Sequence, residues 1–339
     1  MTDQDQIKFN RSLSAYLLNR EYPDSPDFLL GLWKDLCRSI ASKKSVSPSL
    51  PVSFKGDFDY ADFKDSKLNQ KYAVINFLKE EINRELGTFI KTFFLQGSFG
   101  EGNALENWSD LDVMIIFNEK LFKSRENLIF ARQVLRRFSL LFYKIDPLNH
   151  HRFHLATSLD LNYYPQSFLP LAAFRDGLWL AGEKEFEVKV RDDAFEKTQD
   201  LLGRAKHFKK RVQFLPENLT EFKLDLSHLF LLPSILLQIK DIYLPKRLSF
   251  ERAKKKFPKL DFSVIDEASA LREKWQTLNL VKHYPNWCIR HLPDMVNNLA
   301  VMILAAPARK KKIPIADPKL RDFIQRSSEL YEAACQLKI

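Results

Sequence analysis

Residues 92–117 read TFFLQGSFGEGNALENWSDLDVMIIF. A polar loop with several glycines separates two apolar runs, and this pattern predicts a strand, a turn and a second strand. Asp110 and Asp112 stand two positions apart at the entrance to the second run. Because successive side chains of a strand point to opposite faces, we expect these two carboxylates to share one face.

Such a carboxylate pair is unusual without a compensating charge. Two ionised carboxylates ~5 Å apart repel each other by roughly 3 kcal/mol at an effective dielectric constant near 20. A divalent cation removes this repulsion, and Mg²⁺ uses one or two protein carboxylates together with substrate phosphates and water. At the first turn, Gly97 allows close approach of the backbone and Ser98 offers a hydroxyl, which suits phosphate oxygens. The residues alone therefore predict phosphoryl or nucleotidyl transfer.

The spacing of these residues resembles the signature of the polymerase-β-like nucleotidyltransferase superfamily. Gly97-Ser98 is followed by eleven residues and then by Asp110-Leu111-Asp112 at the start of an apolar strand. The resemblance implies a Mg²⁺- or Mn²⁺-dependent enzyme that moves a nucleoside monophosphate, expected to be AMP from ATP, to a hydroxyl-type acceptor. It also implies that Asp110 and Asp112 hold the metal and that Gly97 and Ser98 hold the β,γ-phosphates.

The family places a third carboxylate on the strand that follows the next helix, and two residues compete for this role. In Ser158-Leu159-Asp160-Leu161-Asn162-Tyr163, polar and apolar residues alternate as on a half-buried strand, with Asp160 on the polar face. Alternatively, Asp146 ends the apolar run 140–145. We favour Asp160 as the third catalytic and metal-binding residue. If neither carboxylate reaches the metal, a non-catalytic nucleotide-binding protein on the same fold becomes the alternative.

Three histidines lie between these two candidates, at positions 150, 151 and 154. Histidine titrates near neutral pH, so one of them can act as a general base or bind phosphate. The alternative is that they are loop residues beside a charged cleft. No glutamate or cysteine lies at metal-ligand spacing nearby in the sequence, which argues against a zinc site.

The whole chain predicts an α+β protein with a small mixed sheet, flanking helices, an N-terminal helical extension and a C-terminal all-helical domain. Within 339 residues we place the extension and a linker at 1–66, the nucleotidyltransferase domain at 67–186 and the helical domain at 187–339. The second half resembles the arrangement in aminoglycoside and lincosamide nucleotidyltransferases. The first residues, MTDQD, do not resemble a secretory signal, and three scattered cysteines predict reduced thiols, so we expect a cytoplasmic protein.

Helical periodicity is clearest at residues 67–86, before the first strand, and from residue 125 into the 140s, after the second strand. Residues 173–185 resemble the last strand of the domain. Residues 44–66 carry prolines, serines and aspartates and predict a loop or linker. The longest apolar stretch, Leu229–Leu237, is too short to span a membrane and contains Pro233, so we expect no membrane partner.

The net charge of +10 favours anionic partners. Two basic clusters, Lys246–Lys259 and Arg309–Lys312, are either solvated faces or contacts to a nucleoside triphosphate or an RNA backbone. We expect a nucleoside triphosphate and a small-molecule or protein acceptor as partners, with an RNA acceptor as the alternative. An interaction protein that uses the domain only as a scaffold is a further alternative.

Overall fold

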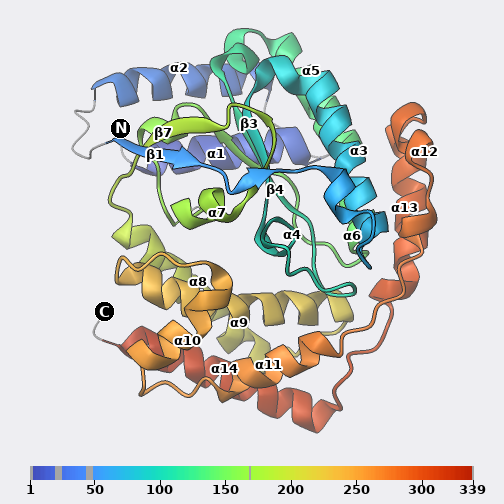
Figure 1. Cartoon of the computed structure of the whole chain (residues 1–339). Helices are drawn as coiled ribbons and strands as arrows, with labels where there is room; N and C mark the ends of the chain where they lie inside the picture. Colours follow the sequence, from blue (N-terminus) through green and yellow to red (C-terminus); the bar gives the residue numbers. More distant parts are fainter. Residues whose placement is uncertain (1–2, 20–24, 43–48, 168, 338–339) are drawn as a thin grey trace.

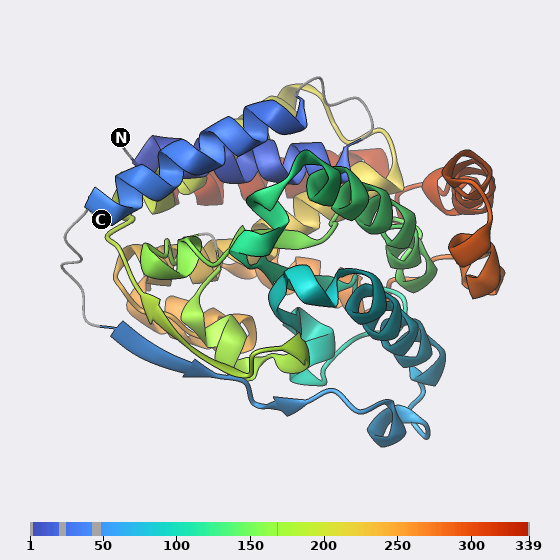
Figure 2. The same ribbon diagram turned by 90° about the horizontal axis from the view of Figure 1, so that it is seen from above.

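The computed structural model describes residues 3–19, 25–42, 49–167 and 169–337 of the chain. A small mixed sheet lies among helices in one part of the molecule, and a purely helical part packs beneath it (Figure 1). Two further helices at the N-terminus lie beside the sheet (Figure 2). The predicted α+β class, with N-terminal helices and a C-terminal helical part, is confirmed.

The main sheet has five strands in the order β2-β6-β3-β4-β5. Its strands are β2 (Gly56–Asp57), β3 (Ile90–Gln96), β4 (Asp112–Phe117), β5 (His154–Thr157) and β6 (Leu178–Gly182). Strand β3 runs antiparallel to both β4 and β6, whereas β5 is parallel to β4 and β2 is parallel to β6. A second sheet pairs β1 (Ser49–Ser53) with β7 (Glu185–Lys189) in antiparallel fashion.

Helices on both sides of the sheet explain why its central strands are apolar at nearly every position. Phe93 and Ile115 point into one core, whereas Phe94 and Met114 point into another. A strand that is buried on both faces reads as a continuous apolar run. The helices around the sheet are α1 (Asp3–Leu18), α2 (Pro26–Ser42), α3 (Asn69–Leu86), α4 (Gly97–Glu101), α5 (Arg125–Phe138), α6 (Leu141–Ile145) and α7 (Leu171–Asp176).

The predicted linker at 44–66 is wrong over part of its described residues. Residues 44–48 lie outside the described residues, but 49–53 and 56–57 are β1 and β2. Each strand pairs with a segment more than a hundred residues away, so no local pattern marks it. Strands β1 and β2, which precede residue 66, pair with β7 and β6, and β7 itself extends across residue 186. The division into domains at residues 66 and 186 stays a prediction.

A second core, which is built on one apolar helix, α9, lies among the C-terminal helices. They are α8 (Ala194–Gln213), α9 (Leu219–Ile239), α10 (Lys246–Lys256), α11 (Ser263–Glu273), α12 (Asn286–His291), α13 (Asp294–Arg309) and α14 (Asp317–Gln336). By length and composition α9 alone among the described helices is apolar enough to cross a membrane, and 67% of that apolar window is buried inside the protein. Its apolar side chains, such as Leu229 and Leu236, form the centre of the helical core.

Helices α12 and α13 leave the helical part and return to the side of the sheet, beside α3 and α5 (Figure 1). Lys144 of α6 donates hydrogen bonds to the carbonyl of Tyr284 at 2.6 Å and to Oδ1 of Asn286 at 2.5 Å. Arg290 of α12 forms an ion pair with Glu81, a buried residue of α3. The chain therefore crosses between the two parts several times.

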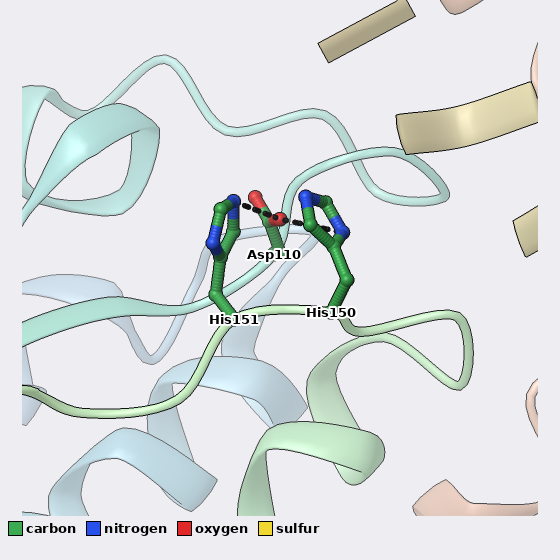
Figure 3. Close-up of side chains that lie close together, drawn as sticks. All are labelled: Asp110, His150 and His151. Carbon is green, nitrogen blue, oxygen red and sulfur yellow. Dashed lines mark ion pairs between the residues drawn. The ribbon is translucent and has the colours of Figure 1, made fainter. Parts of the chain in front are cut away.

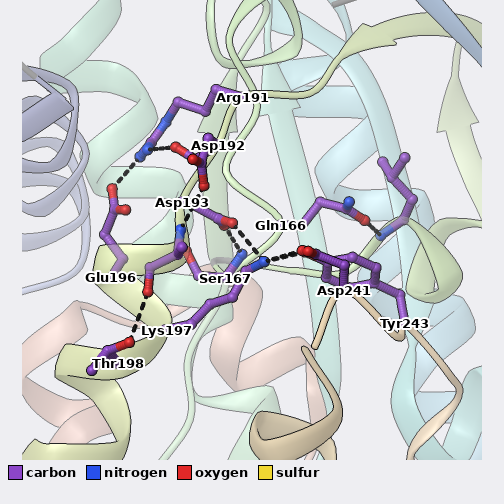
Figure 4. Close-up of polar contacts among 12 residues, drawn as sticks. Gln166, Ser167, Arg191, Asp192, Asp193, Glu196, Lys197, Thr198, Asp241 and Tyr243 are labelled. Atoms are coloured by element: carbon purple, nitrogen blue, oxygen red, sulfur yellow. Dashed lines mark hydrogen bonds and ion pairs between the residues drawn. The ribbon is translucent and has the colours of Figure 1, made fainter. Parts of the chain in front are cut away.

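A buried polar network joins the end of β7 to the first turn of α8 (Figure 4). The ammonium of Lys197 lies 3.0 Å from Oδ1 of Asp193 and 3.2 Å from Oδ1 of Asp241, and it also contacts the hydroxyl of Tyr243. The backbone N–H of Ser167 donates to the other oxygen of Asp193. This network ties the first turn of α8 to the backbone at Ser167 and to the segment that follows α9.

Candidate functional site

The turn after β3 brings the backbone directly against a carboxylate of the neighbouring strand. Gly97 has a φ of +62°, in the left-handed region that favours glycine. A Cβ atom added to Gly97 would lie 2.6 Å from Oδ2 of Asp112, which is too close for any side chain. The pairing of Gln96 with Asp112 in the β3–β4 ladder sets this approach. The glycine therefore provides the space that the Asp112 carboxylate occupies.

The carboxylates of Asp110 and Asp112 both lie close to the imidazole of His151, but only Asp112 belongs to strand β4. Strand β4 begins at Asp112, and Asp110 lies in the loop before it. Ser109 holds this loop, because its hydroxyl accepts a hydrogen bond from the N–H of Leu105 at 2.9 Å. The predicted shared strand face is thus wrong in detail, since Asp110 reaches the site from the loop.

Three imidazoles surround the two carboxylates. Nε2 of His151 lies 3.4 Å from Oδ2 of Asp110, and Nδ1 of His150 lies 3.9 Å from the same oxygen (Figure 3). Nε2 of His154 lies 3.6 Å from Oδ1 of Asp112. The parallel β4–β5 pairing explains the last contact, because it sets His154 opposite Met114 and therefore on the face that carries Asp112.

These side chains form two groups with the arrangement of metal ligands. One group is Asp110, His150 and His151, and the other is Asp112, His151 and His154. Within each group the ligand atoms lie within 4.8 Å of one another. A divalent cation is therefore compatible with the donor atoms of the site.

The electrostatics of the site favour an ionised Asp112 carboxylate and a neutral His150 imidazole. Burial opposes ionisation of Asp112, but contact with His154 and the charges of His151 and Lys246 outweigh it and lower the pKa of Asp112 to about 2. Burial is the main reason that the pKa of His150 falls to about 4, and the neighbouring His151 adds to this effect. Near pH 7 His150 is therefore neutral, which is the form that binds metals.

The structure does not bring Asp160 to this site, and the predicted strand at 158–163 is wrong. Strand β5 ends at Thr157, which pairs with Phe117 at the far end of β4, and Asp160 follows in a 3₁₀ turn. The carboxylate of Asp160 is buried and accepts hydrogen bonds from Gln6, Asn10 and Thr157 at 2.6–2.9 Å. Phe117 lies five positions after Asp112 in β4, a distance of roughly 17 Å along a strand.

Asp146, the alternative, lies nearer to the site but is already paired. Its Oδ2 accepts from Nζ of Lys223 at 2.5 Å, and both side chains are buried. Its Oδ1 accepts from the N–H of Leu148 at 3.1 Å. The segment 141–145 before it is helix α6, in the region where the sequence predicts helix from residue 125 into the 140s. Burial raises the pKa of Asp146, and the nearby charge of Asp110 acts in the same direction.

A cavity of about 480 Å³ adjoins this ion pair. Asp146 forms part of its wall, together with Lys71 at the start of α3 and Lys144 at the end of α6. Asn279, before the return to α12, closes another side. The cavity thus lies between the sheet part and the connection from α11 to α12.

The helical part also contributes one cation to the site. Lys246, the first residue of α10, is close enough to Asp110 and Asp112 for their charges to act on its ammonium. The surrounding protein lowers the pKa of Lys246, and the two carboxylates partly offset this effect. Ser98 lies beside Gly97 in the first turn of α4. The predicted phosphate-binding role of Gly97 and Ser98 stays a prediction.

Sequence reasoning recognised the histidines but not their arrangement. Their acidic partners, Asp110 and Asp112, are not neighbours in the chain but lie about forty residues upstream. Only the pairing of β5 with β4 reveals the contact. The alternation of polar and apolar residues at 152–157 could have predicted this contact. A strand placed at 152–157, instead of at 158–163, positions His154 beside Asp110 and Asp112.

Residues 75–152 match the family model of the nucleotidyltransferase domain. The match begins in α3, includes β3, β4 and α5, and ends just after His150 and His151. Neither the curated proteins nor the solved structures include a significant match to the chain. The prediction of a polymerase-β-like nucleotidyltransferase is therefore confirmed at the level of this domain. The likeness to aminoglycoside and lincosamide enzymes stays a prediction.

Proposed function

Because the chain contains a nucleotidyltransferase domain, we propose that it transfers a nucleoside monophosphate from a nucleoside triphosphate to a hydroxyl-type acceptor and releases pyrophosphate. The expected donor is ATP, and the expected acceptor is a small molecule or a protein side chain. The observation that carries the proposal is the convergence of Asp110 and Asp112 beside Gly97, where only a glycine leaves room for a carboxylate.

Each of these residues has a defined task in the proposed reaction. Asp110 and Asp112 hold the divalent cation, which when bound polarises the α-phosphate and stabilises charge on the attacking and leaving oxygens. Gly97 allows the triphosphate to approach the backbone closely, and the hydroxyl of Ser98 donates a hydrogen bond to it. Lys246 faces the same place from the helical part and neutralises phosphate charge.

The cavity beside Asp146 supports a small-molecule acceptor. Its volume of about 480 Å³ falls within the range that holds small ligands. Lys71 and Lys144 line it, so an acceptor with an acidic group is favoured. An RNA acceptor depends instead on the basic helix α10. Within that helix Lys254 is already paired with Asp266 at 2.8 Å, which weakens the case for RNA.

The position of Asp160 favours a second candidate function, which is nucleotide binding without catalysis. Gln6, Asn10 and Thr157 already use the carboxylate that was predicted to complete the catalytic set. A protein of this kind would bind a triphosphate through the remaining residues and turn over slowly or not at all.

One experiment distinguishes the two candidates. Each of the four nucleoside triphosphates, labelled with ³²P in the α-phosphate, is incubated with the protein, a divalent cation and a cell lysate. We expect labelled product that disappears, by at least about a hundredfold, in Asp112→Asn. The matched control is Asp65→Asn, which changes an exposed carboxylate before α3. Circular dichroism confirms that both variants fold.

Two outcomes would change these conclusions. Wild-type transfer by Asp112→Asn would remove the catalytic assignment of this residue. Absence of label in every reaction, combined with calorimetric binding of a triphosphate, would replace the enzyme by the nucleotide-binding candidate.

A further inference from the structure

We propose that the cation of this site is a divalent first-row transition ion, bound by imidazole nitrogen as well as carboxylate oxygen, and not Mg²⁺. His151 is assigned as its nitrogen ligand, because it belongs to both groups of potential ligands. The inference rests on the proposed function for the use of the cation, but its chemical argument concerns only the donor atoms of this chain.

The separations between donor atoms are those of ligands that share one ion. Two atoms that each lie about 2.1 Å from an ion are roughly 3.0–4.2 Å apart, depending on the angle between them. His151 Nε2 and Asp110 Oδ2 are 3.4 Å apart, and His154 Nε2 and Asp112 Oδ1 are 3.6 Å apart. The separation of His150 Nδ1 and Asp110 Oδ2, 3.9 Å, also falls in this range. These separations are longer than the usual length of an N–H···O hydrogen bond.

The hydrogen bonding of His150 provides a second, independent observation. Both of its ring nitrogens are buried and have no hydrogen-bond partner among the described residues. An imidazole that serves only to pack the interior would leave a donor and an acceptor unpaired, at a cost of about 1–3 kcal/mol for each group. Coordination of one nitrogen removes part of this cost. The ring lies beside the Asp110 carboxylate, with His151 on the other side (Figure 3).

The fold builds this set of donors from two neighbouring strands and the loops that precede them. Asp110 comes from the loop before β4, Asp112 opens β4, and His154 opens the neighbouring strand β5. The loop between α6 and β5 contributes His150 and His151. Each group therefore joins one carboxylate to two imidazoles, and among the described residues no third carboxylate belongs to either group.

This composition selects against magnesium. Mg²⁺ requires oxygen ligands in near-ideal octahedral geometry, and it gives up its water molecules reluctantly. Imidazole nitrogen instead suits the first-row transition ions, whose affinity for N and O sites follows a known order. Two carboxylates alone can bind either class of ion, so the preference depends on the histidines. Removal of the imidazoles should therefore abolish the selectivity while leaving the carboxylate sites present.

Manganese provides a direct test, because Mn²⁺ is paramagnetic. The full chain, freed of metal with a chelator, is titrated with Mn²⁺ alone and without nucleotide, and pulsed electron paramagnetic resonance detects nitrogen nuclei bound to the ion. We expect ¹⁴N modulation of imidazole type from the wild-type complex. We also expect Mn²⁺ to bind at least about tenfold more tightly than Mg²⁺ in a competition titration.

Variants then identify the ligand. His151→Ala should weaken Mn²⁺ binding by at least about tenfold and reduce the ¹⁴N modulation, with little effect on Mg²⁺ binding. The matched control, His291→Ala, removes an exposed imidazole at the end of α12. It should leave both the affinity for Mn²⁺ and the ¹⁴N modulation unchanged. The wild-type spectrum remains informative even if His151→Ala fails to fold.

The proposal is overturned if the wild-type Mn²⁺ complex lacks ¹⁴N modulation, if Mg²⁺ displaces Mn²⁺ at equal concentration, or if a folded His151→Ala retains the wild-type signal. These readouts need no turnover. A protein that shows ¹⁴N coupling but transfers no nucleotide would disprove the proposed function and leave this inference standing. The reverse result would leave the function standing and disprove the inference.

Discussion

The contact between Gly97 and Asp112 shows at the scale of single residues why the motif needs a glycine. The carboxylate occupies the space that a side chain at position 97 would fill. The backbone there also has a positive φ, which costs about 1–2 kcal/mol for most other residues. Position 97 is therefore restricted to glycine for two separate reasons. The space taken by the Asp112 carboxylate concerns the site more than the fold.

Gly97→Ala should reduce transfer much more than it reduces stability. The new methyl group must displace the Asp112 carboxylate, so we expect at least a hundredfold loss of transfer and a free energy of unfolding lower by about 1–2 kcal/mol. Labelled-nucleotide transfer and urea unfolding measure the two effects. Gly203→Ala is the control, because nothing lies within 4 Å of its new methyl group in helix α8, where alanine should stabilise by up to about 1 kcal/mol. A variant at position 97 with wild-type transfer contradicts the assigned role.

The sequence predicted some of these residues and missed others for a physical reason. Gly97, Asp110 and Asp112 lie within one strand-turn-strand unit, where short-range spacing determines the geometry. Asp160 was misplaced because alternation of polar and apolar residues at 158–163 also fits a turn packed on α1. The sequence did not predict the contact of His154 with Asp112, because Asp112 lies on a strand that is adjacent in space but remote in the chain.

Among the elements, the best predicted were those with a strong period of their own. Helices α3 and α5 and strands β3 and β4 lie where periodicity placed them. Strands β1 and β2 escaped prediction because they are short and depend on distant partners for their hydrogen bonds. Helix α7 was read as part of a strand, and the strand β6 begins only after Gly177.

The buried ion pair between Asp193 and Lys197, at the start of α8, is predicted to stabilise the packing of this helix. Lys197 and Asp193 are only 3% and 2% exposed, so Lys197→Met leaves the Asp193 carboxylate buried without its cation. We expect a loss of about 3 kcal/mol in the free energy of unfolding, measured by urea titration. Lys209→Met changes an exposed lysine of the same helix and should alter stability by less than about 0.5 kcal/mol. Equal stability of the two variants would mean that the network contributes little.

At the scale of the whole molecule, the core between α8 and α9 predicts sensitivity to mild acid. His228 of α9 lies beside His207, with ring centroids 4.7 Å apart, and its Nδ1 is buried with no hydrogen-bond partner in the described part of the chain. Burial is the main cause that lowers the pKa of His228 to about 3, and the charge of Arg204 adds to it. The folded protein therefore resists protonation at this position over a pH range in which the unfolded chain accepts a proton.

The sign of this effect is a loss of stability as the pH falls. The contribution of the neutral His228 side chain to the free energy of unfolding is complete above pH 6.5, which is the pKa of histidine in the unfolded chain. This contribution declines progressively as the pH falls toward 3. At pH 5 the expected loss is about 2 kcal/mol relative to pH 7.5. Urea unfolding at the two pH values measures it, and His228→Asn should show a correspondingly smaller difference. An identical pH dependence in both proteins would rule out His228 as the source.

The pairing of β1 with β7 has a consequence for the order of events during synthesis. Ser49 takes its place opposite Lys189, which the ribosome adds long after β1 has been made. At 5–20 residues per second, the interval is on the order of ten seconds. Throughout that time β1 has no partner strand, and β2 likewise waits for β6. The earliest segments of this sheet are thus among the last to be incorporated, and the nascent chain carries unpaired strand edges until the final strand emerges.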